Sequence, residues 1–123
     1  MQRQAAAKAY GNAAKETSSA RDLEANLLLR SAARIQSIRD GWDGRKAELG
    51  DALLFNRRLW TIFIDSLLRD DNPLPAEIRR NVVSLGVFVI NRTIKLSGEP
   101  KPEGLNTLIN INRELAAGLL GRG

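Results

Sequence analysis

The sequence predicts an all-α fold, a small bundle of about four helices. Apolar residues recur at helical spacing in several segments, and glycine, proline or short polar stretches separate these segments. The length of 123 residues suits one domain, which at this size can form a single core of modest stability. A hydrophobic content of 43% argues against disorder throughout the chain.

The expected helices lie roughly at residues 20–39, 45–69, 75–97 and 103–119, inside one helical domain at 19–120. Residues 1–18 are rich in alanine and basic residues, and Tyr10 is their only large side chain. Gly11 weakens a helix there. This stretch is therefore expected to be a weakly ordered N-terminal arm. The alternative is a segment that becomes ordered on a partner.

The first helix is expected to begin after Ser19, whose hydroxyl can cap the free amides at its start. Gly41 and Gly44 mark its end. Its apolar stripe consists of Leu23, Leu27, Ile35 and Ile38.

The second helix is the one around which the chain is organised. Its principal apolar face carries Leu53, Asn56, Trp60, Phe63 and Leu67. Leu59, Ile62 and Leu68 fall on other faces, so most sides of this helix must be buried. It is either the central helix of the bundle or half of a surface that a partner completes. The Asp70–Pro75 stretch then ends it.

The third segment is ambiguous at first, because residues 82–90 are rich in β-branched side chains that also suit a buried strand. Its start at Pro75 and its length of about 20 residues favour a helix. Two apolar stripes result, one of Ile78, Val82, Leu85 and Val89, the other of Val83, Val87, Ile90 and Ile94. Gly86 in mid-helix indicates either a tight crossing within the chain or a notch for a partner helix.

The last helix follows a loop of glycine, proline and charged residues at 97–104. Its stripe consists of Leu105, Leu108, Ile109, Leu115 and Leu119. Asn106, Asn110 and Asn112 interrupt this helix. Because asparagine is a poor helix former, three of them predict specific hydrogen bonds.

No catalytic constellation is present in the sequence, so the chain is not expected to be an enzyme or to hold a metal or cofactor. It has neither histidine nor cysteine, and it lacks a glycine-rich phosphate loop. Asp70 and Asp71 indicate a turn rather than a cation site. No apolar run is long enough to span a membrane, and the start has no signal-peptide core, so a soluble cytoplasmic protein is expected.

The formal net charge of +5 raises the question of nucleic-acid binding. Acidic residues are interspersed with the basic ones along the whole chain, which is typical of solvated helix faces. Nucleic acid is therefore not expected to be the direct partner. The apolar helix surface, in excess of what so small a bundle can bury, predicts protein–protein binding instead.

Five motifs in order resemble the FlaF family of flagellar biosynthesis regulators from alphaproteobacteria, over about Tyr10 to Leu119. The strongest is NRRLWT at residues 56–61, which matches the family's N-R-R-L-W-T. Asn72, Leu74-Pro75 and Ile78-Arg79 resemble N-x-L-P-x-x-L-R. The others are AY at 9–10 with RDLE at 21–24, VVSL at 82–85, and LININR at 108–113 followed by Gly118-Leu119. Phe88 and Ala20 depart from the family's tryptophan and proline.

The resemblance implies flagellin handling. FlaF proteins act with FlbT in post-transcriptional control of flagellin, and they bind flagellin as secretion chaperones. The implied partners are the terminal amphipathic helices of flagellin and FlbT. Two alternatives stay open, an RNA-binding regulator of the flagellin message and an adaptor that acts only through FlbT. The sequence also leaves the oligomeric state open.

We hypothesise a groove between the second, third and fourth expected helices, into which a partner helix fits. The expected apolar floor is Trp60, Phe63, Leu67, Gly86 and Phe88. The expected polar rim is Asn56, Arg57, Arg58, Asn112 and Arg113. The alternative for Trp60 and Phe63 is plain core. For the polar residues the alternatives are an ion pair of Arg57 with Asp51 or Asp65, and an Asn56 that caps a neighbouring loop.

Overall fold

The computed structural model describes residues 2–121, with side chains from Ala20 onward. Four long helices form the fold: α1 (Gln2–Asp40), α3 (Leu49–Leu67), α4 (Ala76–Gly98) and α5 (Leu105–Leu119). A single turn, α2 (Trp42–Arg45), and two 3-10 turns at Lys46–Glu48 and Pro102–Gly104 connect them. No strand occurs within residues 2–121, so the predicted all-α bundle is confirmed, including the helix at residues 82–90.

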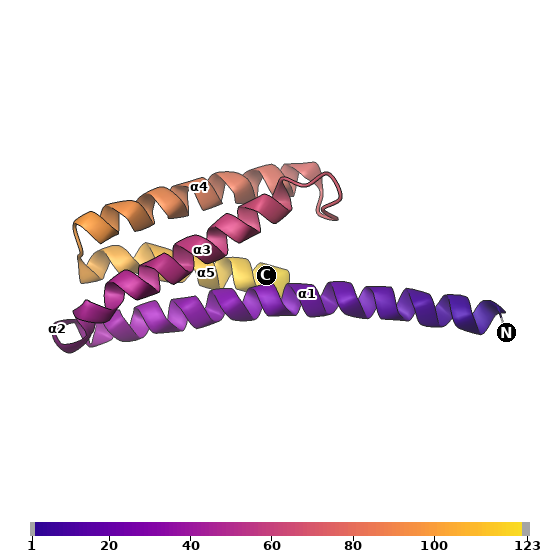
Figure 1. Cartoon of the computed structure of the whole chain (residues 1–123), viewed down its shortest axis with the longest axis horizontal. Helices are drawn as coiled ribbons and strands as arrows, with labels where there is room; N and C mark the ends of the chain where they lie inside the picture. The colour runs from indigo at the N-terminus through magenta and orange to yellow at the C-terminus, as the bar shows by residue number, and fades with distance from the viewer. Residues whose placement is uncertain (1, 122–123) are drawn as a thin grey trace.

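The first helix begins much earlier than its expected start near Ala20, because α1 already begins at Gln2. The additional segment is rich in alanine, lysine and glutamine, which are strong helix formers. Ser19 therefore lies inside α1 rather than at its start. The backbone of α1 continues past the end of α5 at its N-terminal side (Figure 1). That residues 1–18 form a weakly ordered arm stays a prediction, and Met1 lies outside the described residues.

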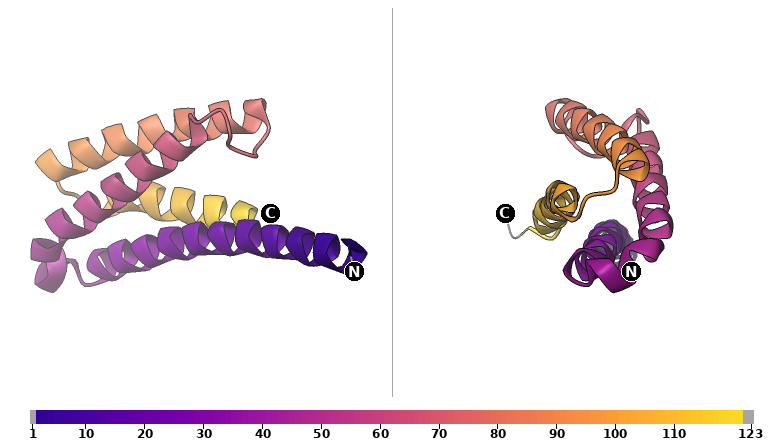
Figure 2. Two further views of the ribbon diagram at one scale, coloured as in Figure 1. Left: turned by 45° about the vertical axis from the view of Figure 1, so that its right-hand side comes forward. Right: turned by 90° about the vertical axis from the view of Figure 1, so that its left-hand side faces the viewer.

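The helices associate as two pairs. α1 packs along α5, α3 packs along α4, and α3 also contacts α1, whereas α4 and α5 touch only sparsely. Viewed along the bundle, α3 runs along one side from α1 at the bottom to α4 at the top, and α4 stands apart from α5 (Figure 2). The buried core includes Leu28, Ile35 and Ile38 of α1, Leu53 and Trp60 of α3, and Leu105, Leu108 and Ile109 of α5. α4 is thus covered mainly by α3.

The loop between α3 and α4 is held by the side chain of Asn72. Its Nδ2 donates to the carbonyl of Ser66 at 3.0 Å, and its Oδ1 accepts from the amide of Leu74 at 3.0 Å. Arg69 pairs with Asp71 at 3.1 Å on the exposed side of the same loop. The expectation of a turn at Asp70-Asp71 is therefore confirmed. None of the helices in the described part of the chain is both long and apolar enough to cross a membrane.

The turn between α1 and α3 is closed by Arg45. Its guanidinium donates two hydrogen bonds to the carboxylate of Glu48, at 2.8 and 3.0 Å, and a further one to Ser37 of α1. The hydrogen bond from Arg45 holds the pKa of Glu48 below its ordinary value. These contacts connect the turn that precedes α3 to the end of α1.

Candidate partner-binding surface

A buried hydrogen-bond network joins α1, α3 and α5. The indole Nε1 of Trp60 donates to Oδ1 of Asn112 at 2.9 Å. Nδ2 of Asn112 in turn donates to Oδ1 of Asn56 at 2.7 Å and to the carbonyl of Leu28 at 3.3 Å. The hydroxyl of Ser31 also donates to Oδ1 of Asn56, at 2.9 Å. Specific hydrogen bonds were expected of the α5 asparagines, and Asn112 makes them inside the core.

This network places several expected groove residues in the interior. Trp60 is fully buried, and Phe63 and Leu67 are almost fully buried. Trp60 and Phe63 are therefore part of the core, which is the alternative to a place in the groove floor. Asn56 and Asn112 are fully buried as well, so neither lies at a rim. Polar side chains in a core need hydrogen-bond partners, and here the two asparagines and the tryptophan supply most of them to one another, while Nδ2 of Asn56 is buried without a partner within the described residues.

Gly86 is buried where α4 crosses α3. A Cβ at this position would lie 2.6 Å from Cδ1 of Ile64 and 3.1 Å from Cε3 of Trp60. The space that glycine leaves is therefore filled by α3 of the same chain. The structure therefore shows Gly86 at a tight crossing of two helices within the chain, rather than in a notch for a partner helix.

The remaining expected site residues are exposed but scattered. Phe88 is 44% exposed, and the guanidinium of Arg92 covers its ring at 5.5 Å from the centroid. Arg57 and Arg58 lie exposed on α3, and Arg113 of α5 donates to the side chain of Gln36. Within residues 20–121, no ion pair links Arg57 to Asp51 or Asp65. The ten expected residues do not form one open groove, and their part in binding stays a prediction.

The structure does expose another apolar surface, the second stripe of α4. We call the residues Val83, Val87, Ile90 and Ile94 the α4 row. Val87 is 50% exposed and Ile94 is 52% exposed, while Val83 and Ile90 are half-buried. Leu68 at the end of α3 is 65% exposed and lines a pocket together with Val83. The sequence shows this row through its helical spacing, but it does not show that Val87 and Ile94 are exposed.

The pocket at the start of the α4 row has a volume of about 400 Å³. Its lining residues are Leu67, Leu68, Ala76, Arg79, Arg80, Val83 and Ser84. Nη1 of Arg79 donates to the carbonyl of Arg69 at 3.1 Å, but its Nε is buried without a hydrogen-bond partner. Neither Arg79 nor Arg80 takes part in an ion pair within residues 20–121. We call this space the arginine pocket.

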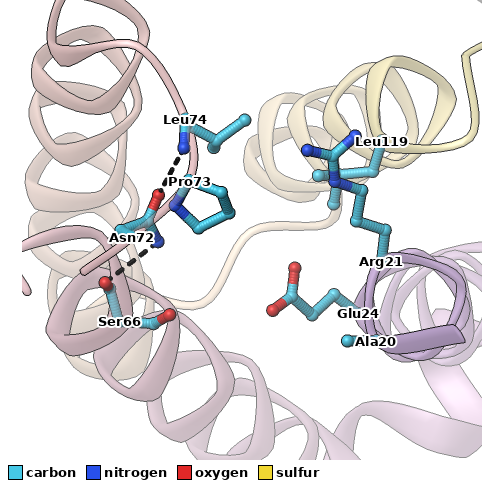
Figure 3. A pocket seen from close by; sticks show the side chains of 8 residues that line it. All are labelled: Ala20, Arg21, Glu24, Ser66, Asn72, Pro73, Leu74 and Leu119. Carbon is cyan, nitrogen blue, oxygen red and sulfur yellow. Dashed lines mark hydrogen bonds between the residues drawn. The ribbon is translucent and has the colours of Figure 1, made fainter. Parts of the chain in front are cut away.

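A second pocket, of about 370 Å³, lies between the two helix pairs (Figure 3). α1 contributes Ala20, Arg21 and Glu24, while Ser66, Asn72, Pro73, Leu74 and Leu119 complete the lining. The side chains of Arg21 and Glu24 extend from α1 into this space (Figure 3). Partial burial raises the pKa of Glu24, and the positive charge of Arg21 offsets only part of this effect.

Comparison with known families gives one result that covers nearly the whole chain. A family model described as flagellar protein FlaF matches residues 6–119. No curated protein and no solved structure matches the chain. The matched range contains α1 from residue 6 onward, all of α3, α4 and α5, the buried network and the α4 row. The chain therefore belongs to the FlaF family of flagellar proteins.

Proposed function

We propose that this protein binds flagellin as a non-enzymatic export chaperone in the cytoplasm, and that with FlbT it takes part in post-transcriptional control of flagellin synthesis. Membership of the FlaF family supports a flagellar role. The observation that carries the binding proposal is the α4 row, in which Val87 and Ile94 are each about half exposed. An apolar stripe with exposed members, on a helix that α3 covers and α5 touches only sparsely, is typical of a docking surface.

The α4 row has the geometry that a partner helix requires. Its members follow one another at intervals of four, three and four residues, so they lie along one side of α4. An amphipathic helix presents its own apolar residues at matching intervals and packs between them. Terminal flagellin segments of this kind would aggregate or polymerise if they stayed uncovered. We propose that the α4 row binds and covers these flagellin segments.

The test is a titration of purified cognate flagellin monomer, with affinity measured by calorimetry. We expect the double variant Val87→Ser and Ile94→Ser to bind at least about tenfold more weakly, since each truncated anchor costs roughly 1 kcal/mol or more. The matched control is Leu23→Ser with Ile62→Ser. These side chains are 61% and 68% exposed on α1 and α3 and lie outside the α4 row. The control should bind like the wild type.

Circular dichroism must show that both double variants keep the helix content of the wild type. Equal loss of affinity in both would contradict the assignment of the α4 row. The two alternatives, direct RNA binding and an adaptor acting only through FlbT, both predict that the wild type does not bind flagellin. RNA binding would in addition weaken steeply with salt.

A further inference from the structure

We propose that the arginine pocket receives the free C-terminal carboxylate of the helix that docks on the α4 row, together with an apolar side chain from its last turn. This rests on the proposed function and assigns the C-terminal rather than the N-terminal segment of flagellin to this surface. The pocket combines apolar walls with two arginines that form no ion pair within residues 20–121.

The apolar walls are Leu67, Leu68 and Val83, and they lie directly beside Arg80 and Ser84. Leu68 is 65% exposed, so a partner side chain can contact it without any rearrangement of α3. Burying this surface under an apolar side chain is favourable at roughly 25 cal/mol per Å². The walls therefore favour an apolar group as one part of the ligand.

The charges favour an anion as the other part. The ion pairs within residues 20–121 involve Arg39, Arg45 and Arg69, and none of them involves Arg79 or Arg80. The Nε of Arg79 is buried and its Nη1 donates to the carbonyl of Arg69, so the exposed Arg80 is the arginine that an anion reaches most readily. A carboxylate is the group that an arginine fork binds best in a protein partner.

A chain end supplies both parts at one place. The last turn of a helix carries the terminal carboxylate, the negative end of the helix dipole and its own apolar side chains. An internal aspartate or glutamate would instead have to be buried beside Leu68 and Val83 while the helix continued past the pocket. The pocket lies at the first turns of α4, where such a continuing helix would run beyond the α4 row.

The position of the pocket also sets the direction of the docked helix. The α4 row leads from Val83, at the pocket, to Ile94, eleven residues further along α4. A helix whose C-terminus lies in the pocket runs antiparallel to α4, so the two helix dipoles oppose each other favourably. Eleven residues correspond to roughly 16 Å of helix, so about three turns of the partner cover the row.

The experiment compares three synthetic peptides from the cognate flagellin, each of about 20 residues, against the full-length protein. These are the C-terminal segment with a free carboxylate, the same segment amidated, and the N-terminal segment. We expect the free acid to bind about tenfold more tightly than the amide, as for a charge-assisted hydrogen bond. Amidation by itself stabilises a peptide helix, because it removes a negative charge from the C-terminal end. A preference for the free acid therefore cannot come from helix propensity.

Variants of the protein locate the effect. Arg80→Gln should remove the difference in affinity between the free acid and the amide. Lys95 is an exposed basic residue near the other end of α4, so Lys95→Gln should retain that difference. If free acid and amide bind the wild type equally, or if only the N-terminal peptide binds, the carboxylate assignment is overturned while flagellin binding stands. If neither the peptides nor the flagellin monomer binds, both the carboxylate assignment and the proposed function are overturned.

Discussion

The indole nitrogen of Trp60 donates a 2.9 Å hydrogen bond to the side-chain oxygen of Asn112, which lies 52 residues further along the chain. Two of the family motifs, NRRLWT and LININR, therefore meet inside the bundle through Trp60, Asn56 and Asn112. Asn56 accepts from Asn112 and from Ser31 of α1, so the motifs join three helices. These motif residues lie in the core, and the surface that we propose for a partner lies on α4.

We predict that Asn112→Ala destabilises the fold by about 2–4 kcal/mol, because it leaves the Trp60 Nε1–H and one acceptor contact of Asn56 without their buried partner. The measurement is urea denaturation followed by circular dichroism. Asn110→Ala is the matched control, since Asn110 is exposed on the same helix and its loss should change stability by about 0.5 kcal/mol or less. Equal effects of the two substitutions would show that the network contributes nothing measurable.

Gly86→Ala should destabilise the fold by about 1–3 kcal/mol, although alanine is the better helix former. The new Cβ would lie 2.6 Å from Cδ1 and 2.7 Å from Cγ1 of Ile64, so α3 and α4 must move apart or Ile64 must change rotamer. Shortening that side chain with Ile64→Val in the same protein should restore part of the loss. Thermal and urea denaturation of the single and double variants measure both effects.

Gly50→Ala is the control for this substitution, because a Cβ at Gly50 in the first turn of α3 meets nothing within 4 Å. It should raise stability by up to about 1 kcal/mol through helix propensity alone. If Gly86→Ala were also stabilising, the crossing of α3 and α4 would be looser than the structure shows.

Glu24 predicts a specific pH dependence. Its pKa is raised in the folded state by burial, so its contribution to stability is complete below the unfolded value of about 4.5 and is lost as the pH rises through the folded value. Glu24→Gln should therefore be more stable than the wild type at pH 7, and this advantage should vanish near pH 4. Urea denaturation at both pH values measures it, with the exposed Glu114→Gln as control. An advantage that persists unchanged at pH 4 would contradict the role of ionisation.

The sequence predicts the helices well, because their apolar periodicity and their proline and glycine boundaries are local signals. The start of α1 is the main difference. Gly11 and the lack of bulky apolar residues argue against a helix there, but the alanines favour it. Helix propensity and apolar patterning disagree in this segment, and the backbone follows propensity.

The candidate surface was harder to predict, because periodicity shows which residues share a face but not which helix covers it. Trp60 and Val87 are both apolar residues at regular spacing, yet one is fully buried and the other is half exposed. The difference arises from the pairing of α3 with α4 and of α1 with α5, which depends on contacts distant in sequence. Helical spacing does distinguish the buried Asn112, which falls on the apolar stripe of α5, from the exposed Asn110 on the opposite side.

The most direct test of flagellin binding is size-exclusion chromatography with light scattering, on a mixture of the purified protein and its cognate flagellin monomer. The mixture is run at low and at high salt, because an apolar interface persists where screened charges do not. We predict a complex that co-elutes at both salt concentrations. If the two proteins co-elute at neither salt concentration, direct flagellin binding is contradicted. FlbT and the flagellin leader RNA would then be the partners to test.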